Sequence, residues 1–399
     1  MKSMRSMALA VLTALLLSSS LPAMAAEEDG WLIPKVKDTP SFTDTAGTWC
    51  EAEVATVCEA GLMEGRSADC FAPQDTLMPE HVVAVCARLY SLLTGGDGTV
   101  GQAAEGEAWY QPYYDYLAES LDYSGGSEAL MLNFHATKYP AKRWHFAQIL
   151  YQTLEAADAE LPVLNQVSVV PDSTDPAVLA LYRAGILTGS DAYGTFAGNG
   201  TLNRGQAAAM LARLVDPSLR QRFALESFDL CADVLGLTPE TVVLTVGGTP
   251  VTAAEFANDL CTALHQAGGG SRTALDSAIH TWCFYTAPFQ VLAEEKGVSL
   301  TEEELDQTAQ YAADCDGYLG LDAAYWQCKK AGVLLSSKLN DLYCQADWKA
   351  GTAYYHQDLD KTSQVLLEGA VIEPALESLD LTAVYRRLEA SPFILWNFS

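Results

Sequence analysis

Residues 181–215 read LYRAGILTGSDAYGTFAGNGTLNRGQAAAMLARLV, and they predict a helix, a connecting loop and a second helix. The first helix is expected to end at Gly185, because glycine adopts the left-handed conformation that closes a helix without steric cost. Phe196 lies in the loop, and the second helix begins near Arg204. Apolar residues recur at helical spacing in that second helix, at Ala207, Met210, Leu211 and Leu214. This spacing predicts one buried face.

The same pattern occurs near the start of the chain. Residues 42–44 (FTD), 58–65 (CEAGLMEG) and 71–73 (FAP) align with 170–172 (VPD), 181–189 and the loop around Phe196. Each segment has an aspartate before the first helix, which we expect to cap that helix. A glycine ends the helix, a second glycine follows within four residues, and an aromatic residue precedes the next helix. The second helix of the early segment is apolar at Val82, Val85, Cys86 and Leu89.

A more divergent segment lies between these two. Residues 109–117 (WYQPYYDYL) supply its first helix and residues 142–150 (KRWHFAQIL) its second, while a glycine-rich stretch at 94–106 separates it from the early segment. Self-similarity at a fixed period is typical of repeat architectures. We therefore expect three copies, at residues 40–95, 105–160 and 165–218.

These residues resemble the S-layer homology family, whose pattern is F-x-D, a tryptophan on the first helix, G-I-x-x-G, F-x-P and then T-R-x-E. The resemblance implies three repeats packed as a pseudo-threefold prism within one chain, so that a monomer suffices. It also implies binding to an acidic, often pyruvylated, secondary cell-wall polysaccharide.

In that family the arginine of T-R-x-E lies in a groove between repeats and binds the polymer, which suits a planar guanidinium that grips a carboxylate with two hydrogen bonds. Arg204 and Arg143 match it, whereas the early segment has Met78 and Pro79 there. The resemblance further implies groove roles for Lys142, Asp172 and Trp109. The alternative is that the arginines are solvated residues near helix starts and that the tryptophan belongs to the core.

Residues 219–399 differ in character and predict a helical domain with a small β element. Residues 241–251 (TVVLTVGGTPV) indicate two short strands around a Gly-Gly turn. Thr252 with Glu255, and Thr301 with Glu304, have the spacing of capping boxes. One long helix is expected from about Leu275 to Lys296 and Gly297. The fold class is thus mainly α.

This order of elements resembles the N-terminal chaperone region of SurA/PrsA-type foldases, without their parvulin module. The resemblance implies a non-catalytic chaperone or interaction domain that holds unfolded polypeptide clients. Four aromatic residues are candidates for a client-binding cradle: Trp282, Phe284, Tyr325 and Trp326. An ordinary core is the alternative for them. For the whole chain, a diverged prolyl isomerase and a purely structural envelope scaffold are the alternative functions.

Composition narrows the function further. The formal net charge of -28 argues against nucleic-acid binding, which needs excess Lys and Arg at the contact surface. A basic start, a short apolar run and an A-x-A ending predict a signal peptide at residues 1–25 and export to the cell surface. No later stretch predicts a transmembrane helix.

The histidines and cysteines predict no catalytic or metal site. The six histidines form no H-E-x-x-H motif, and the ten cysteines have no C-x-x-C spacing, so no enzyme, cofactor or metal is expected. The cysteines either pair within two clusters or act as small buried residues.

Overall fold

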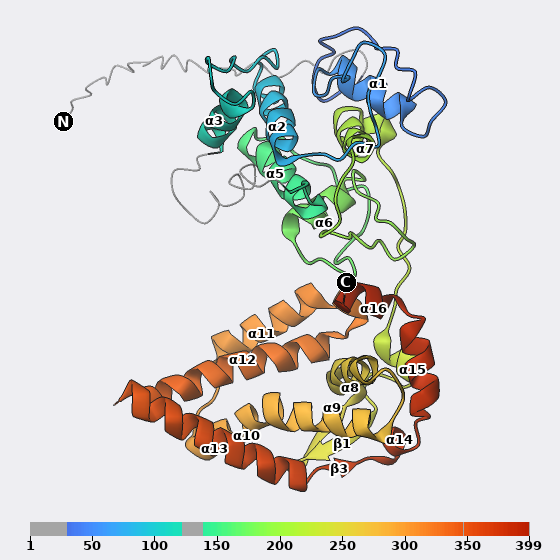
Figure 1. Cartoon of the computed structure of the whole chain (residues 1–399). Coiled ribbons are helices and arrows are strands. Elements are labelled where there is room, and N and C mark those ends of the chain that lie inside the picture. Colours follow the sequence, from blue (N-terminus) through green and yellow to red (C-terminus); the bar gives the residue numbers. More distant parts are fainter. Residues whose placement is uncertain (1–29, 122–138, 346, 399) are drawn as a thin grey trace, which may run out of the picture.

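The computed structural model describes residues 30–121, 139–345 and 347–398, which form two lobes joined by one crossing of the chain (Figure 1). The N-terminal lobe has a single core that runs from Ile33 to Val215. The C-terminal lobe has its own core, from Leu230 to Phe393. The protein is mainly helical, as predicted. The predicted signal peptide, at residues 1–25, lies outside the described residues.

Three pairs of helices build the N-terminal lobe, and they fall where the three copies are predicted. The pairs are α1 (Glu51–Glu59) with α2 (Pro79–Leu93), α3 (Gln111–Ser120) with α5 (Arg143–Ala156), and α6 (Pro176–Arg183) with α7 (Arg204–Val215). The second helix of each pair packs against the first helix of the next: α2 on α3, α5 on α6, and α7 back on α1. The lobe is therefore closed on itself.

A ring of backbone hydrogen bonds joins the three segments that precede the second helices. The N–H of Leu77 donates to the carbonyl of Leu202 over 2.8 Å, Leu202 donates to Ala141 over 3.3 Å, and Ala141 donates to Leu77 over 2.9 Å. All three side chains are completely buried or nearly so. Each segment thus satisfies the polar backbone of another segment in the interior.

The glycines end the first helices as predicted, but the aspartates act differently. Gly61 and Gly185 both have left-handed backbones, with φ of 70° and 73°, directly after α1 and α6. Asp175, not Asp172, caps α6 by accepting from the N–H groups of Ala177 and Val178, and α1 has no side-chain cap. The prediction that Asp44 and Asp172 cap these helices is wrong, because both carboxylates instead bind backbone N–H groups more than 20 residues later.

The C-terminal lobe begins with a π-helical turn at Leu230–Leu235 and the predicted hairpin of β1 (Val242–Val246) and β2 (Thr249–Thr252). A short β3 (Val371–Ile372) pairs with β1, so the antiparallel sheet has the order β2-β1-β3. The other elements of the lobe are helices: α8 (Ala253–Ala267), α9 (Arg272–Tyr285), α10 (Ala287–Lys296), α11 (Glu302–Cys315), α12 (Ala323–Cys344), α13 (Trp348–Glu368), α14 (Pro374–Glu377), α15 (Leu381–Glu389) and α16 (Pro392–Phe398).

Both predicted capping boxes are present, whereas the single long helix is not. Thr252 accepts from the N–H of Glu255, Thr301 accepts from that of Glu304, and each glutamate accepts from its threonine N–H in return. The expected long helix is broken at Thr286 into α9 and α10. Pro288 explains the break, because proline donates no hydrogen bond to the carbonyl four residues earlier and its ring clashes with that carbonyl.

The lobes meet where α16 and the loop after α11 contact the N-terminal lobe (Figure 1). The indole N–H of Trp396 donates to the hydroxyl of Thr195 over 2.8 Å. The N–H of Leu319 donates to the carbonyl of Pro171 over 2.8 Å. The ring of Trp396 also lies edge-on to those of Tyr193 and Phe228, with centroids 5.7 and 5.5 Å apart.

All ten cysteines lie among the described residues, and all are free thiols, seven of them buried. Burial raises the pKa of the Cys86 thiol to about 12 and that of Cys58 to about 11. Both therefore behave as small apolar residues of the core.

Candidate functional site

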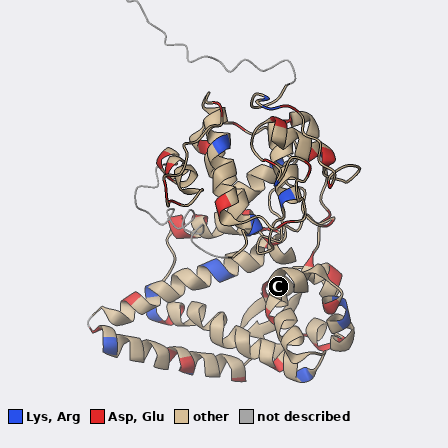
Figure 2. Cartoon of the chain, turned by 45° about the horizontal axis from the view of Figure 1, so that its top comes forward, with Lys and Arg blue, Asp and Glu red and all other residues tan. Residues whose placement is uncertain are grey.

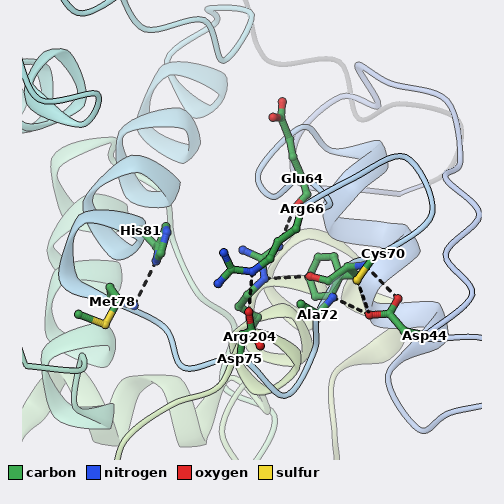
Figure 3. Close-up of polar contacts among 10 residues, drawn as sticks. Asp44, Glu64, Arg66, Cys70, Ala72, Asp75, Met78, His81 and Arg204 are labelled. Atoms are coloured by element: carbon green, nitrogen blue, oxygen red, sulfur yellow. Dashed lines mark hydrogen bonds and ion pairs between the residues drawn. The ribbon is translucent and has the colours of Figure 1, made fainter.

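Arg204 begins α7 and reaches across to the early segment of the chain (Figure 3). Its Nε donates to the carbonyl of Phe71 over 3.0 Å, and a terminal nitrogen donates to the carbonyl of Glu64 over 2.5 Å. The guanidinium lies 4.5 Å above the centre of the Phe71 ring. The residue is only 7% exposed. Arg204 therefore joins two distant segments, and part of its donor fork is already in use.

A second guanidinium lies beside the first. Arg66 forms an ion pair with Asp75, with 2.6 Å between Nε and Oδ2. Burial, and then the positive charge of Arg66, lower the pKa of Arg204. Burial also lowers the pKa of His81, although Glu80 raises it, and the charges of Arg204 and Arg66 lower it further. The His81 imidazole therefore favours the neutral form.

An aspartate fixes the loop that carries Phe71. The carboxylate of Asp44 accepts from the N–H of Phe71 over 2.9 Å and from that of Ala72 over 2.6 Å. Ala72 is left-handed, with φ of 60°, which turns the loop under the arginine. Trp49 lies next to this loop, over Gly205, and its side chain is 57% exposed. We call this set of residues, Asp44, Arg66, Phe71, Asp75 and Arg204, the Arg204 groove, after the groove expected at this arginine from the sequence.

The same frame recurs around Arg143 at the start of α5. Its Nε donates to the carbonyl of Phe196 over 2.7 Å, and its guanidinium lies 5.5 Å from the centre of that ring. Asp172 accepts from the N–H groups of Phe196 and Ala197, each over 2.7 Å. Ala197 is left-handed, with φ of 53°. The two sites therefore share one arrangement, which consists of an arginine, a phenylalanine, an aspartate and a left-handed alanine.

A cavity of about 640 Å³ adjoins this second frame. Its N-terminal-lobe lining includes Trp144, Asp172, Asp175, Phe196 and Asn199. Lys142 reaches this rim, because its Nζ donates to Oδ1 of Asn199 over 3.1 Å. We call this space the Asp172 cavity.

Trp109 lies at the third junction, where α3 packs against α2. It is 49% exposed, and its ring centroid is 5.7 Å from that of His81 on α2. Trp109 and Trp49 each stand directly before the N-cap residue of a first helix. Pro79 occupies the position that Arg143 and Arg204 hold in the other second helices. This junction has a surface aromatic residue but no equivalent guanidinium.

The four aromatic residues predicted to form a client cradle belong to the core of the C-terminal lobe. Trp282 and Tyr325 are 4% and 7% exposed, and Phe284 and Trp326 pack against the same core. Another cavity, of about 500 Å³, lies between α10 and α12 and is lined by Val298, Leu300, Leu305, Leu335 and neighbouring residues. None of the four aromatic residues lines that cavity.

Sequence reasoning missed several residues of these sites. Arg66 follows the glycine of the G-L-M-E-G stretch, so its position after a helix end was the available signal. Phe71 and Phe196 were noted as aromatic residues, but not as the residues that hold the arginines. No sequence pattern around Trp396 indicates its contact with the N-terminal lobe, because its partner Thr195 is 201 residues away.

Two negative observations concern the described residues only. They contain no group of three or more histidine, cysteine, aspartate or glutamate side chains arranged to hold a metal ion. None of their helices has both the length and the apolar character that a bilayer crossing requires.

Comparison with protein families identifies two segments of this chain. The family described as S-layer homology domain matches residues 41–77 and 169–208. Comparisons with curated proteins and with solved structures gave no significant match. The first segment contains Asp44, Arg66, Phe71 and Asp75, and the second contains Arg204. The two matched segments therefore meet in the Arg204 groove.

Proposed function

We propose that this protein attaches to the bacterial cell wall by binding an acidic secondary wall polysaccharide in the Arg204 groove. S-layer homology domains generally mediate cell-wall anchoring and imply a cell-surface location. The observation that carries the proposal is that both matched segments contribute to one site, where the Arg204 guanidinium lies over the Phe71 ring and Arg66 lies nearby (Figure 3). The ligand is an acidic sugar, such as a pyruvylated residue, because paired guanidinium groups favour carboxylates.

The groove has to attract an anion on a chain that is acidic overall. The formal net charge is -28, and acidic and basic residues are interspersed over both lobes (Figure 2). Salt limits the reach of exposed charges to about 8 Å at physiological ionic strength. The local pair of arginines, rather than the net charge, therefore decides which ligand is bound at this place.

The closed packing of the three helix pairs supports a pseudo-threefold prism formed within one chain. The hydrogen-bond ring of Leu77, Ala141 and Leu202 supports it as well, because each segment uses its N–H toward one neighbour and its carbonyl toward the other. In this proposal the middle pair, α3 and α5, is the second repeat and the protein acts as a monomer.

Co-sedimentation with purified cell-wall sacculi tests the attachment. Arg66→Ala removes a half-exposed guanidinium without breaking a contact to the core, so it is expected to weaken binding about tenfold, the size of one charge-assisted contact. Arg204→Lys keeps the charge but loses the planar fork, and it should weaken binding at least as much. Arg272→Ala, which removes an exposed arginine paired with Asp276 on α9, is the matched control.

Removal of the wall polymer from the sacculi should abolish the sedimentation of the wild-type protein. If the wild type stays in the supernatant, or if the two groove variants bind like Arg272→Ala, the proposed function is wrong. Circular dichroism of each variant separates lost binding from lost folding.

For Arg143 we propose a secondary role in the same polymer contact, together with Lys142, Asp172 and Trp109. The cavity that adjoins Arg143 is lined by the carboxylates of Asp172 and Asp175 and not by a second arginine. Arg143→Lys should therefore weaken sedimentation less than Arg204→Lys. An equal or larger loss would reverse the assignment of the two grooves.

For the C-terminal lobe we propose a non-catalytic role in holding unfolded polypeptide segments. The cavity between α10 and α12 supports it, because Val298, Leu300 and Leu305 give it an apolar wall, although Glu255 and Glu294 also line it. Suppression of client aggregation should be lost in Leu305→Asp and kept in Val365→Asp, which changes another exposed apolar residue of the lobe. Turnover of a proline-containing tetrapeptide would instead favour the prolyl isomerase.

A further inference from the structure

The Asp172 cavity is built by both lobes. Eleven residues between Asp172 and Gly200 line it with Trp144 and Gln148 of α5, and the C-terminal lobe adds Tyr318, Leu395 and Trp396. A recess of about 640 Å³ is large enough for a saccharide unit, since ligand pockets typically measure about 300–1,000 Å³. The C-terminal helix is therefore part of the wall of this cavity.

The tryptophan of α16 is held firmly at this position. Its indole N–H donates to Thr195, whose side chain is 2% exposed, and Tyr193 and Phe228 pack against the edges of the ring. Phe393, fully buried in the C-terminal core, anchors the other end of the helix. Trp396 thus joins the two lobes.

The polar groups of the cavity suit hydroxyl donors rather than anions. Its lining contains Asp172 and Asp175, while Lys142 and Arg143 at its edge donate to Asn199 and to the carbonyl of Phe196, so two carboxylates balance two cations. One oxygen of Asp175 caps α6 and the other accepts from Gln148. Asp172 accepts one N–H at each oxygen, which leaves further lone pairs. Carboxylates that are held in place and retain acceptor capacity attract O–H groups.

The aromatic groups supply the apolar part of such a site. Trp144 from the N-terminal lobe and Trp396 and Tyr318 from the C-terminal lobe line the same space as Asn199 and Ser173. Rings with a polar edge bury the apolar face of a ligand while amides and hydroxyls fix its orientation. This combination differs from the Arg204 groove, where two guanidinium groups lie side by side.

We propose that the Asp172 cavity binds an uncharged saccharide unit and that Trp396 and Tyr318 of the C-terminal lobe are part of the binding site. The proposal rests on the wall attachment proposed above for the source of the sugar, and it assigns a second, chemically different subsite to that polymer. Because both lobes contact the saccharide, binding also strengthens their association.

The test uses the full chain and soluble wall-polysaccharide fragments, either native or with their carboxylates chemically reduced to alcohols. Binding is measured by isothermal titration calorimetry. The reduced fragments should bind the wild type, and Trp396→Ala should weaken that binding by at least about tenfold, the loss of one well-packed aromatic contact. Arg66→Ala should leave it unchanged. Trp348→Ala, which removes a 72% exposed tryptophan of α13, is the matched control.

A second variant addresses the docking of the lobes. Ser190→Trp places a large side chain among the lining residues and leaves the bond between Trp396 and Thr195 in place. It should abolish binding of the reduced fragments, while small-angle scattering shows unchanged lobe packing. Reduced fragments that fail to bind the wild type, or that bind Trp396→Ala as well as or better than the wild type, overturn the proposal. If native fragments bind Arg66→Ala and Arg204→Lys as tightly as the wild type, only the proposed attachment at the Arg204 groove is overturned.

Discussion

The Arg204 groove and the Asp172 cavity contain the same arrangement of arginine, phenylalanine and aspartate, but different residues surround it. In both, an arginine at a helix start donates to a phenylalanine carbonyl, and an aspartate accepts from the N–H groups of that phenylalanine and of the alanine after it. They differ in what surrounds this frame, because Arg66 adds a second positive charge to the first site whereas Trp396 and Tyr318 cover the second. A repeat can thus preserve its geometry while neighbouring residues determine the ligand.

The largest expected difference between the two sites concerns their arginines. Arg204→Ala removes two hydrogen bonds from a charged donor and a contact with the Phe71 ring, so it should lower the free energy of unfolding by about 3–4 kcal/mol. Arg143→Ala removes one such bond and should cost about 2 kcal/mol. Urea unfolding of the full chain measures both. Equal losses of unfolding free energy would show that the two arginines stabilise the fold to the same extent.

The aspartates should respond to pH in opposite directions. Burial raises the pKa of Asp44, but the N–H groups of Phe71 and Ala72 outweigh it and lower the pKa overall. For Asp172, burial prevails over the N–H groups of Phe196 and Ala197 and raises the pKa. Asp44 therefore stabilises the fold above pH 4 and loses this effect as the pH falls. The contribution of Asp172 is greatest at low pH and is lost as the pH rises through its raised pKa.

Asn substitutions should reveal this contrast. Each should cost about 1–2 kcal/mol through a weakened hydrogen bond. The cost of Asp44→Asn should shrink between pH 6 and pH 3, and that of Asp172→Asn should grow. Urea midpoints at each pH measure both. Parallel profiles would mean that the two loops share one environment.

The next difference lies three residues after the N-cap of each second helix. His145 accepts from the N–H of Lys142, as Gln206 does from that of Asn203. Burial, and then the charge of Lys142, lower the pKa of His145 to about 4. Because the unfolded chain binds this proton near pH 6.5, stability should fall as the pH drops from about 6.5 to 4.

His145→Gln keeps the acceptor and removes the titration. It should abolish about 1–2 kcal/mol of that pH dependence, a figure already reduced for solvent screening. Thermal unfolding in that pH range provides the measurement. Gln206→Glu at the equivalent position of α7 does not serve as a comparison variant, because it adds a charge. An unchanged pH profile would exclude His145 as its origin.

The smallest expected effect is the gain in stability when the left-handed alanine of each site is replaced by glycine, and it should be equal at the two sites. The left-handed backbones of Ala72 and Ala197 are sterically strained by their Cβ atoms, and glycine would not have this strain. Part of this gain is lost to the greater freedom of glycine in the unfolded chain. Ala72→Gly and Ala197→Gly should each stabilise the protein by about 0.5–1 kcal/mol. A gain at only one position would show that the two frames are strained differently.

Local signals in the sequence predicted local structure well. Gly185 ends its helix, the Gly-Gly turn joins β1 and β2, and both threonine capping boxes form, because each depends on residues within a few positions. The role of Asp44 was predicted wrongly, since its partners come from a loop 27 and 28 residues later. Arg204 was identified as a candidate from its motif, but its contact with Phe71 spans 133 residues and has no local pattern.

The ring formed by Leu77, Ala141 and Leu202 has a consequence for how the chain is made. Its last member lies 125 residues after its first, so the ring cannot close until residue 202 is available. Contacts of such long sequence separation form late and slow folding. When synthesis proceeds from the N-terminus, the N-terminal lobe therefore completes its closed packing only after Leu202 has been added to the chain.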